Sequence, residues 1–281
     1  MIRQRTIRKE VRLAGSGVHS GRPVRLTLLP SDGGKIVFRR KDLGGRETAI
    51  DPRRVESENS TTIVGRDFKV RTVEHLMATL FAFGVGSVIV ELDADEIPIL
   101  DGSAAPFVDA LQKAGSVVLS EPVPTLVVRR GFAVEAGGAS VVVEPVRGGK
   151  ELELAYTIEY AHPAIGRQSC GFRLTRKTFA SGIAPARTFG FLKDVEALHS
   201  RGLALGASME NTVALDAERI VNGPLRFPDE FVRHKLLDLT GDLALLGRPV
   251  AGRFTAHKAG HRLHLQAARF LLDHPAFWTE G

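Results

Sequence analysis

The residues best suited to chemistry lie close together between residues 227 and 246. Projected onto a helix at about 100° per residue, one narrow stripe carries His234, Lys235, Asp238 and Asp242. Leucine and valine cover nearly all of the remaining surface, and a buried carboxylate without a partner is costly, so the stripe predicts a bound cation or metal ion. His234 and Asp238 are four residues apart and stand close enough on a helix to hold one ion. A buried hydrogen-bonded pair is the alternative interpretation.

A second helix with polar side chains is predicted over residues 73–83. Apolar residues recur at helical spacing after Thr72, the expected N-cap, and Gly84 is a natural C-terminal stop. Glu74 and His75 lie off this apolar stripe. Small side chains beside His75 allow another element to approach it closely, so this helix is the predicted partner of the first.

Together the two helices supply the ligands of a catalytic metal site. Two His and one Asp with a fourth position open to water are typical of catalytic zinc, and here they are His75, His234 and Asp238. Zinc lowers the pKa of its bound water and polarises a carbonyl group. Glu74, beside a ligand but not on the metal, suits the base that takes the proton from that water. The pattern is not that of His-Glu-x-x-His zinc proteases, because residue 78 is Ala78.

Three more imidazoles follow near the end of the chain. His261 comes directly after Gly260, where a predicted strand over residues 250–256 gives way to a helix. A histidine at such a turn can face a cleft and, when protonated, can donate to a leaving amine. For His257 and His264 we expect instead an exposed, histidine-rich turn.

The composition indicates a basic globular protein. Its 281 residues are 43% hydrophobic, and the single cysteine, Cys170, excludes an internal disulfide and a cysteine-rich zinc site. The charged N-terminus and the lack of a stretch of about 20 apolar residues predict a cytoplasmic protein. A net charge of +6 predicts an anionic partner: a phosphorylated small molecule, an anionic membrane or a nucleic acid. Scattered Lys and Arg residues without interleaved aromatic side chains argue against nucleic acid.

Strands precede helices in both halves of the chain, which predicts an α+β fold rather than a doubly wound parallel sheet. Hairpins are expected at residues 32–34 and 65–67, and Ser103 is the expected cap of a helix through Leu111. Prolines around Val123 predict a linker between domains spanning 1–121 and 126–281. The predicted strands cover residues 6–13, 24–28, 35–39, 61–64, 68–71, 87–92, 126–130, 140–144, 152–159 and 168–174, and further helices cover 175–181 and 192–201.

Six segments in order along the chain carry a family resemblance: Thr72–Leu76, Glu96–Ala104, His162–Ile165, Ala186–Phe191, Phe231–Lys235 and Gly260-His261. They resemble the motifs of the UDP-3-O-acyl-N-acetylglucosamine deacetylases, the zinc amidases that commit Gram-negative bacteria to lipid A synthesis. The resemblance implies two similar domains, each a mainly antiparallel sheet packed on a pair of helices, with the active site at their interface.

The same resemblance implies roles for individual residues. One zinc ion, with iron(II) as an alternative, is expected on His75, His234 and Asp238, and Glu74 is the expected general base. The other expected catalytic residues are His261 as general acid, Asp242 as the carboxylate that orients it, and Thr188 as a donor to the oxyanion.

The resemblance also implies substrate contacts. Phe189 and Lys235 are expected to contact the substrate, with Lys235 near the sugar or diphosphate. Asp194 is assigned to the nucleotide-sugar end and His19 to the cleft, although a surface acid and a turn residue are equally open interpretations. The acyl chain is expected beside residues 202–213.

The predicted reaction is hydrolysis of the 2-acetamido group of an acylated nucleotide sugar by a monomer that binds no nucleic acid. Attraction to the anionic inner membrane is a further hypothesis. Two rivals remain at this point: a metal-dependent amidase or esterase with another substrate, which would not be inhibited by UDP, and a basic nucleic-acid-binding protein, which would contain no metal.

Overall fold

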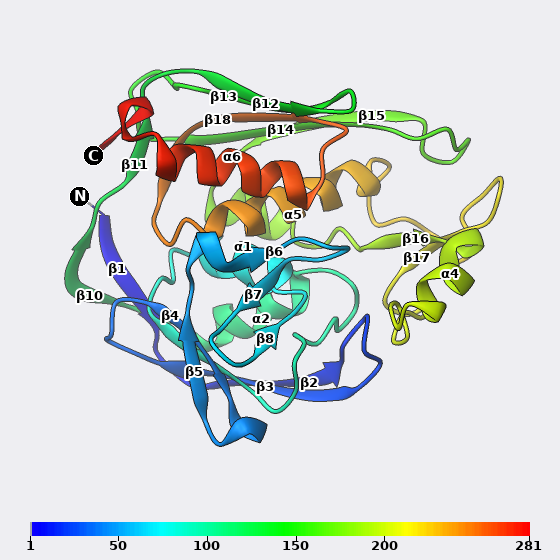
Figure 1. Cartoon of the computed structure of the whole chain (residues 1–281), viewed down its shortest axis with the longest axis horizontal. Coiled ribbons are helices and arrows are strands. Elements are labelled where there is room, and N and C mark those ends of the chain that lie inside the picture. The colour runs from blue at the N-terminus through cyan, green and yellow to red at the C-terminus, as the bar shows by residue number, and fades with distance from the viewer. Residues whose placement is uncertain (1) are drawn as a thin grey trace.

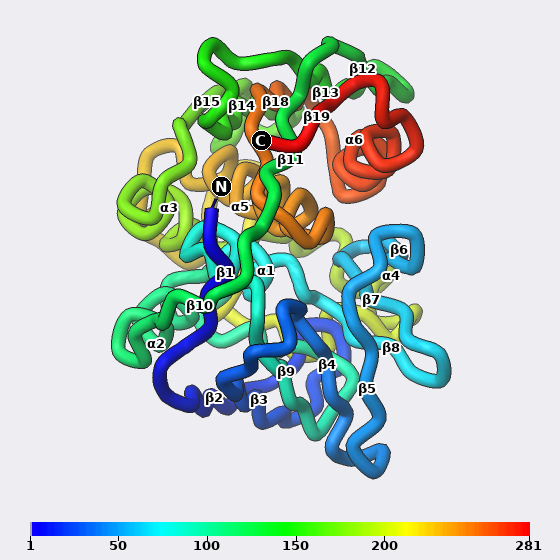
Figure 2. The backbone as a smooth tube through the Cα atoms, turned by 90° about the vertical axis from the view of Figure 1, so that its left-hand side faces the viewer, coloured from blue at the N-terminus to red at the C-terminus, as the bar shows by residue number. Residues whose placement is uncertain are grey.

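The computed structural model describes residues 2–281. Its layers follow one another as sheet, helices, helices, sheet, and the two views agree on this arrangement (Figures 1 and 2). The first half of the chain forms one outer sheet with its helices, and the second half forms the other. The chain is thus α+β, as predicted, and the helices of the two halves meet in the middle of the molecule. No helix within residues 2–281 combines the length and apolar character needed to cross a bilayer.

The sheet of the first half has five strands in the order β2-β3-β9-β4-β5. Strand β3 alternates buried and exposed positions, so that Val24, Leu26 and Leu28 face the helices. The pairs are antiparallel except for β4 and β9, which run parallel. The strands are β2 (Val11–Ser16), β3 (Pro23–Pro30), β4 (Ile36–Arg40), β5 (Arg46–Ala49) and β9 (Val88–Leu92).

A small antiparallel sheet leads from the outer sheet to the central helices. Its strands are β6 (Val55–Glu56), β7 (Thr62–Val64) and β8 (Lys69–Val70), and the 3-10 turns Lys41–Leu43 and Pro52–Arg54 precede it. The helices of this half are α1 (Glu74–Ala82) and α2 (Ala105–Ala114). Helix α1 is buried from Glu74 to Leu80, because it lies between its own sheet and the helices of the second half.

The sheet of the second half has seven strands and is centred on β18 (Val250–His257), which pairs antiparallel with β13 and parallel with β14 and β11. Strand β14 alternates strictly, so Leu154, Tyr156 and Ile158 face the helices. The other strands are β11 (Leu126–Val128), β12 (Phe132–Ala136), β13 (Ala139–Glu144), β14 (Leu152–Glu159), β15 (Arg167–Arg173) and β19 (Trp278–Glu280).

Helix α5 is buried around nearly its whole circumference, because it lies between this sheet and α1. Helix α6 covers the same sheet beside α5, with one apolar face inward. A short parallel pair, β16 and β17, and helix α4 form a lobe at the right of Figure 1. The bounds are α3 (Arg176–Gly182), β16 (Phe189–Phe191), the 3-10 turn Leu192–Asp194, α4 (Val195–Ser200), β17 (Val213–Leu215), α5 (Glu230–Ala244), α6 (His261–Asp273) and the 3-10 turn Pro275–Phe277.

Several local predictions were wrong. The predicted linker is largely a strand, β10 (Ser116–Val123), which pairs with β1 (Ile2–Ile7). The predicted strand 6–13 is broken, because residues 8–10 turn the chain from β1 into β2. The turn at 32–34 does not form a hairpin, because β9 lies between β3 and β4. Both predicted helix caps are displaced toward the C-terminus, to Val73 and Ala104.

Candidate metal centre and active site

Helices α1 and α5 cross closely at a glycine. A Cβ atom built on Gly241 would lie 2.1 Å from the backbone oxygen of Glu74, so only a glycine allows this separation. The crossing brings the start of α1 against the second half of α5. Residues from the two halves of the chain therefore share one buried site, as the two polar helices predicted.

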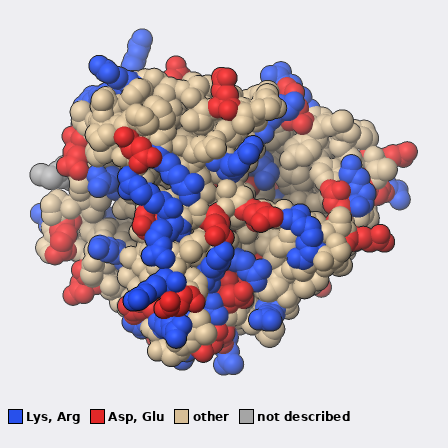
Figure 3. Space-filling model, in the orientation of Figure 1, with Lys and Arg blue, Asp and Glu red and all other residues tan. Residues whose placement is uncertain are grey.

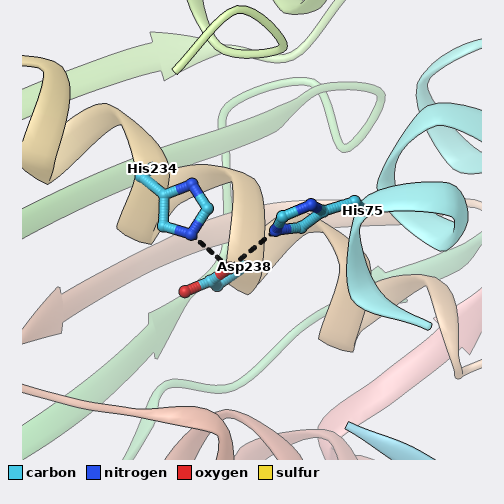
Figure 4. A group of neighbouring side chains, drawn as sticks. All are labelled: His75, His234 and Asp238. Atoms are coloured by element: carbon cyan, nitrogen blue, oxygen red, sulfur yellow. Dashed lines mark ion pairs between the residues drawn. The ribbon is translucent and has the colours of Figure 1, made fainter. Parts of the chain in front are cut away.

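The crossing brings His75, His234 and Asp238 together, with both rings facing the carboxylate (Figure 4). Oδ1 of Asp238 lies 3.5 Å from Nε2 of His234 and 3.9 Å from Nε2 of His75. The three residues are at most 4% exposed. Three ligand atoms from both halves thus converge on one point inside the protein.

The surroundings prepare these groups to bind a cation. Nδ1 of His234 donates to the carbonyl oxygen of Ala186 at 3.1 Å, which leaves Nε2 without a proton and free to act as a ligand. Burial, and then the neighbouring His234, lower the pKa of His75 to about 3, and burial also lowers the pKa of His234. Burial raises the pKa of Asp238, but Lys235 and the neighbouring imidazoles outweigh it and keep that pKa well below its usual value. The site therefore contains two neutral imidazoles and one carboxylate.

This donor set fits a tetrahedral divalent ion. Two ligand atoms that each lie about 2.0–2.1 Å from such an ion are separated by about 3.3–3.5 Å. The separation from Asp238 to His234 already has that value, and the one to His75 is only slightly longer. Neutral imidazoles and a carboxylate are the ligand types that zinc and iron(II) accept.

Glu74 lies at the first position of α1, next to His75. It is 5% exposed, and its Oε2 accepts a hydrogen bond from the backbone N–H of Thr61 at 3.0 Å. Burial raises its pKa to about 7. A carboxylate with this pKa can take up a proton near neutral pH and release it again.

His261 lies at the first position of α6, after Gly260, as predicted. Its Nδ1 donates to Oδ2 of Asp242 at 2.8 Å, and its Nε2 lies 4.0 Å from Oδ2 of Asp238. Burial alone lowers the pKa of His261, but Asp242 outweighs burial and raises it to about 10. The ring is therefore a protonated imidazole that points Nε2 toward the metal centre.

Two further residues form direct hydrogen bonds to the carboxylate of Asp242, and neither was predicted from the sequence to belong to the site. His264 is fully buried, so the prediction of an exposed turn was wrong for it, and its Nδ1 donates to Oδ2 of Asp242 at 2.8 Å. The hydroxyl of Thr61 donates to Oδ1 of Asp242 at 2.6 Å. His264 could have been found from its helical spacing of three residues from His261, whereas Thr61 carries no local signal.

Asp242, His261 and His264 also lie close enough together to resemble a metal site. Their hydrogen bonds indicate a different arrangement, because two ring N–H groups and a hydroxyl already occupy both carboxylate oxygens. Tyr156 lies behind this group, with its hydroxyl 3.1 Å from Nε2 of His264. The group is a hydrogen-bonded network that holds His261.

Two predicted substrate contacts, Phe189 and Lys235, lie against the metal-ligand residues, and the predicted catalytic residue Thr188 directly precedes Phe189 in the chain. Thr188 precedes β16, two residues after the Ala186 carbonyl that orients His234, and its hydroxyl makes no hydrogen bond within residues 2–281. The ring of Phe189 packs edge-on against His234, with centroids 6.3 Å apart. Nζ of Lys235 donates to Oδ2 of Asp238 at 2.7 Å and lies 5.6 Å from the centroid of Phe189.

The two remaining candidates lie elsewhere. The backbone of His19 is held by Glu96, and its Nδ1 accepts from the N–H of Ala204 at 3.4 Å, so it touches the segment where the acyl chain is expected. Asp194 is exposed at the end of a 3-10 turn before α4 and has no hydrogen-bond partner for its side chain within residues 2–281. The contacts of neither residue join it to the metal centre.

Charge on the visible face follows no single pattern. Lys and Arg side chains are distributed over the face in Figure 3 with Asp and Glu among them. His257 is the half-buried last residue of β18, so the prediction of an exposed turn was wrong for it too, and it pairs with Glu159 at 3.4 Å. A continuous basic stripe of the kind that follows a nucleic-acid backbone is not visible on this face.

Comparison with known proteins places this site in a family. The model of the UDP-3-O-acyl N-acetylglycosamine deacetylase family matches residues 4–273, which include every residue of the site. The UDP-3-O-acyl-N-acetylglucosamine deacetylase of Thermodesulfovibrio yellowstonii is 42% identical, covering 96% of this chain and 92% of the relative. The enzyme of the same name from Myxococcus xanthus is 45% identical, covering 97% and 87%. The resemblance predicted from the motifs is thereby confirmed, and the chain belongs to the UDP-3-O-acyl N-acetylglycosamine deacetylase family.

Proposed function

We propose that this protein hydrolyses the 2-acetamido group of UDP-3-O-acyl-N-acetylglucosamine to give acetate and UDP-3-O-acyl-glucosamine, the committed step of lipid A biosynthesis. Family membership and the names of the relatives support the substrate. The observation that carries the chemistry is the convergence of two neutral imidazoles and a carboxylate, beside a buried acid and a protonated histidine.

We assign one zinc ion to His75, His234 and Asp238, with iron(II) as the alternative ion. A divalent ion held there would lower the pKa of a water molecule and polarise the carbonyl of the acetamido group. Asp238 supplies the negative charge, and the hydrogen bond from His234 to Ala186 fixes the direction of the imidazole. Lys235 limits the charge of the site by its ion pair with Asp238.

Two residues move protons in the proposed reaction. The carboxylate of Glu74 accepts a proton from the water as the water oxygen forms a bond to the carbonyl carbon. Nε2 of His261 then gives its proton to the glucosamine nitrogen as the carbon–nitrogen bond breaks, and acetate leaves. Asp242 acts through His261, because it holds Nδ1 and stabilises the protonated ring. The pKa values of Glu74 and His261 lie in the order that a base and an acid at neutral pH require.

The remaining roles concern the substrate. The free hydroxyl of Thr188 is the proposed donor to the developing oxyanion. Phe189 and Lys235 are the proposed contacts of the sugar, with Lys235 near the diphosphate. Asp194 at the nucleotide end and His19 in the cleft are further proposals, and the second is supported by the contact between His19 and Ala204 in the segment where the acyl chain is expected.

The test is turnover of the UDP-sugar by the zinc-loaded protein and by the variants Glu74→Gln and His261→Ala. Each variant should lose a factor of about 10²–10⁴ in kcat and keep its fold. Glu135→Gln, on exposed β12 of the outer sheet, is the matched control and should be unchanged. Near-full turnover by either site variant would remove that residue from the mechanism. Hydrolysis of another amide without competition by UDP would favour the amidase alternative.

We further propose that residues 1–121 and 126–281 are two domains of a cytoplasmic monomer. The active site at the contact of α1 and α5 makes both parts necessary for catalysis. Light scattering of the eluted protein should give the mass of one chain, and a dimer mass would contradict the monomer. Attraction to the anionic inner membrane predicts sedimentation with anionic but not neutral liposomes, and equal recovery from both would refute it.

A further inference from the structure

A cavity of about 790 Å³ lies between the two halves of the molecule, away from the residues assigned to catalysis. The first half contributes the start of β1, the start of β4 and the second half of α1. The second half contributes the start of β14, the junction of β15 and α3, and the loop from α5 to β18. Figure 2 faces this side of the molecule, with β1 beside α1 and below α5. The volume is within the range of about 300–1,000 Å³ found for small-molecule sites.

The cavity and the metal centre lie on opposite faces of the same two helices. Met77 lines the cavity and follows His75 by two positions on α1, and Ala244 lines it and follows Asp242 by two positions on α5. Two positions on an α-helix correspond to a rotation of about 200°, so each pair points in nearly opposite directions. No residue that lines the cavity has a role in the proposed deacetylation.

The lining combines an apolar wall with a basic rim. Met77 and Leu152 are buried in the wall, and Phe81, Ile36 and Ile50 are half-buried beside them. The charged residues of the lining are six cations, Arg3, Lys35, Lys150, Arg173, Arg176 and Arg248, and one carboxylate, Glu151. Basic side chains therefore surround the apolar wall, with almost no acid to balance them.

Several of these cations are not neutralised by the protein. Arg173 pairs with Glu151 at 2.8 Å, and Arg248 pairs with Glu280 at 3.0 Å. Lys35 and Lys150 form no ion pair within residues 2–281.

Arg176 is fixed at the rim and has no acidic partner among the described residues 2–281. It donates to the carbonyl oxygen of Phe83 at 3.0 Å, and its guanidinium lies 4.8 Å from the centroid of the Phe83 ring. An anionic ligand would thus meet the ammonium groups of Lys35 and Lys150 and a positioned guanidinium.

We propose that this cavity is a second binding site, specific for an organic anion with a single alkyl chain. The carboxylate or phosphate headgroup binds Lys35, Lys150 and Arg176, and the chain lies against Met77 and Phe81. The first and second halves of the chain each contribute one wall of the cavity. A bound ligand would therefore contact both halves of the chain, on the side of α1 and α5 opposite the metal centre. Binding at this site does not depend on the deacetylase reaction.

The test is calorimetric titration of the full-length, metal-loaded protein with monomeric dodecanoate and, in a second arm, dodecyl phosphate. Lys35→Glu/Lys150→Glu reverses the charge at the two unpaired lysines, and Lys177→Glu, exposed on α3 outside the lining, is the matched control. The double variant should bind at least tenfold more weakly, and the control should bind like the wild type. Dodecanol and inorganic phosphate should each bind more than tenfold more weakly than the anionic amphiphile.

Trp278 provides a second readout that does not involve activity. It is the single tryptophan of the chain, and the guanidinium of Arg248 in the lining lies 5.6 Å from its ring centroid. Its fluorescence should change with dodecanoate in the wild type and the control but not in the double variant. Binding of neither amphiphile, or binding that the double variant retains and the UDP-sugar substrate abolishes, would overturn the proposal.

Discussion

Thr61→Val is the most informative single change, because Thr61 links the proposed base to the proposed acid. Its backbone N–H binds Glu74, and its hydroxyl donates to Oδ1 of Asp242 at 2.6 Å. Valine has nearly the same shape and keeps the backbone contact, so the substitution removes only the hydroxyl. Asp242 is fully buried, and water cannot replace the lost donor.

The magnitude follows from that single hydrogen bond. A hydrogen bond to a charged group contributes about 1.5–3 kcal/mol, and we expect the melting temperature to fall by roughly 3–10 °C. Because Asp242 positions His261, some of the same energy is lost from the transition state, and kcat should fall roughly 10- to 100-fold with little change in KM.

The assay is steady-state deacetylation by the zinc-loaded proteins, with thermal unfolding measured in parallel. Thr61→Ser restores the hydroxyl and should recover most of kcat. A valine variant with wild-type kcat, or a serine variant as slow as the valine variant, would refute the positioning role.

The remaining predictions concern packing and pH. Gly241→Ala should reduce both stability and kcat, because the new Cβ meets the backbone of Glu74, and an unchanged melting temperature would contradict the close crossing. Burial raises the pKa of Glu230, but its hydrogen bonds with Arg187 and Arg226 outweigh burial and lower the pKa below 4.5. A lowered folded-state pKa means that this contribution is fully present above pH 4.5 and is lost as the pH falls through the lower folded value. The difference in melting temperature between the wild type and Glu230→Gln should therefore shrink as the pH is lowered progressively below 4.5, and a constant difference would exclude the ion pair of Glu230 with Arg187 as its source.

The cluster of His75, His234 and Asp238 was predictable because its signal is local. On α5, the helical spacing of the polar residues within an apolar sequence is enough to predict that they are buried. On α1, Glu74 and His75 interrupt an apolar pattern and give the same prediction. Sequence spacing cannot show that the helices cross at Gly241, but two buried polar helices in one chain have few other ways to satisfy their charges.

The errors arose where long-range pairing decides the structure. Residues 120–123 resemble a linker, yet Pro122 and Val123 pair with Arg3 and Ile2 of the N-terminal strand, because a backbone ladder tolerates proline at an edge. The turn at 32–34 has hairpin residues, but β9 inserts between its flanking strands. The role of Thr61 could not be predicted for the same reason, because its hydrogen-bond partner Asp242 is 181 positions away in the sequence.

The central claim is that His75, His234 and Asp238 hold one metal ion that the deacetylation requires. The most direct test measures metal content and turnover of the UDP-sugar on the same sample, before chelation, after chelation and after zinc is restored. We expect about one ion per chain, with activity lost and regained in proportion, and a folded His234→Ala variant that lacks both. Full turnover by the metal-free protein, or a full equivalent of metal in the variant, would contradict the account.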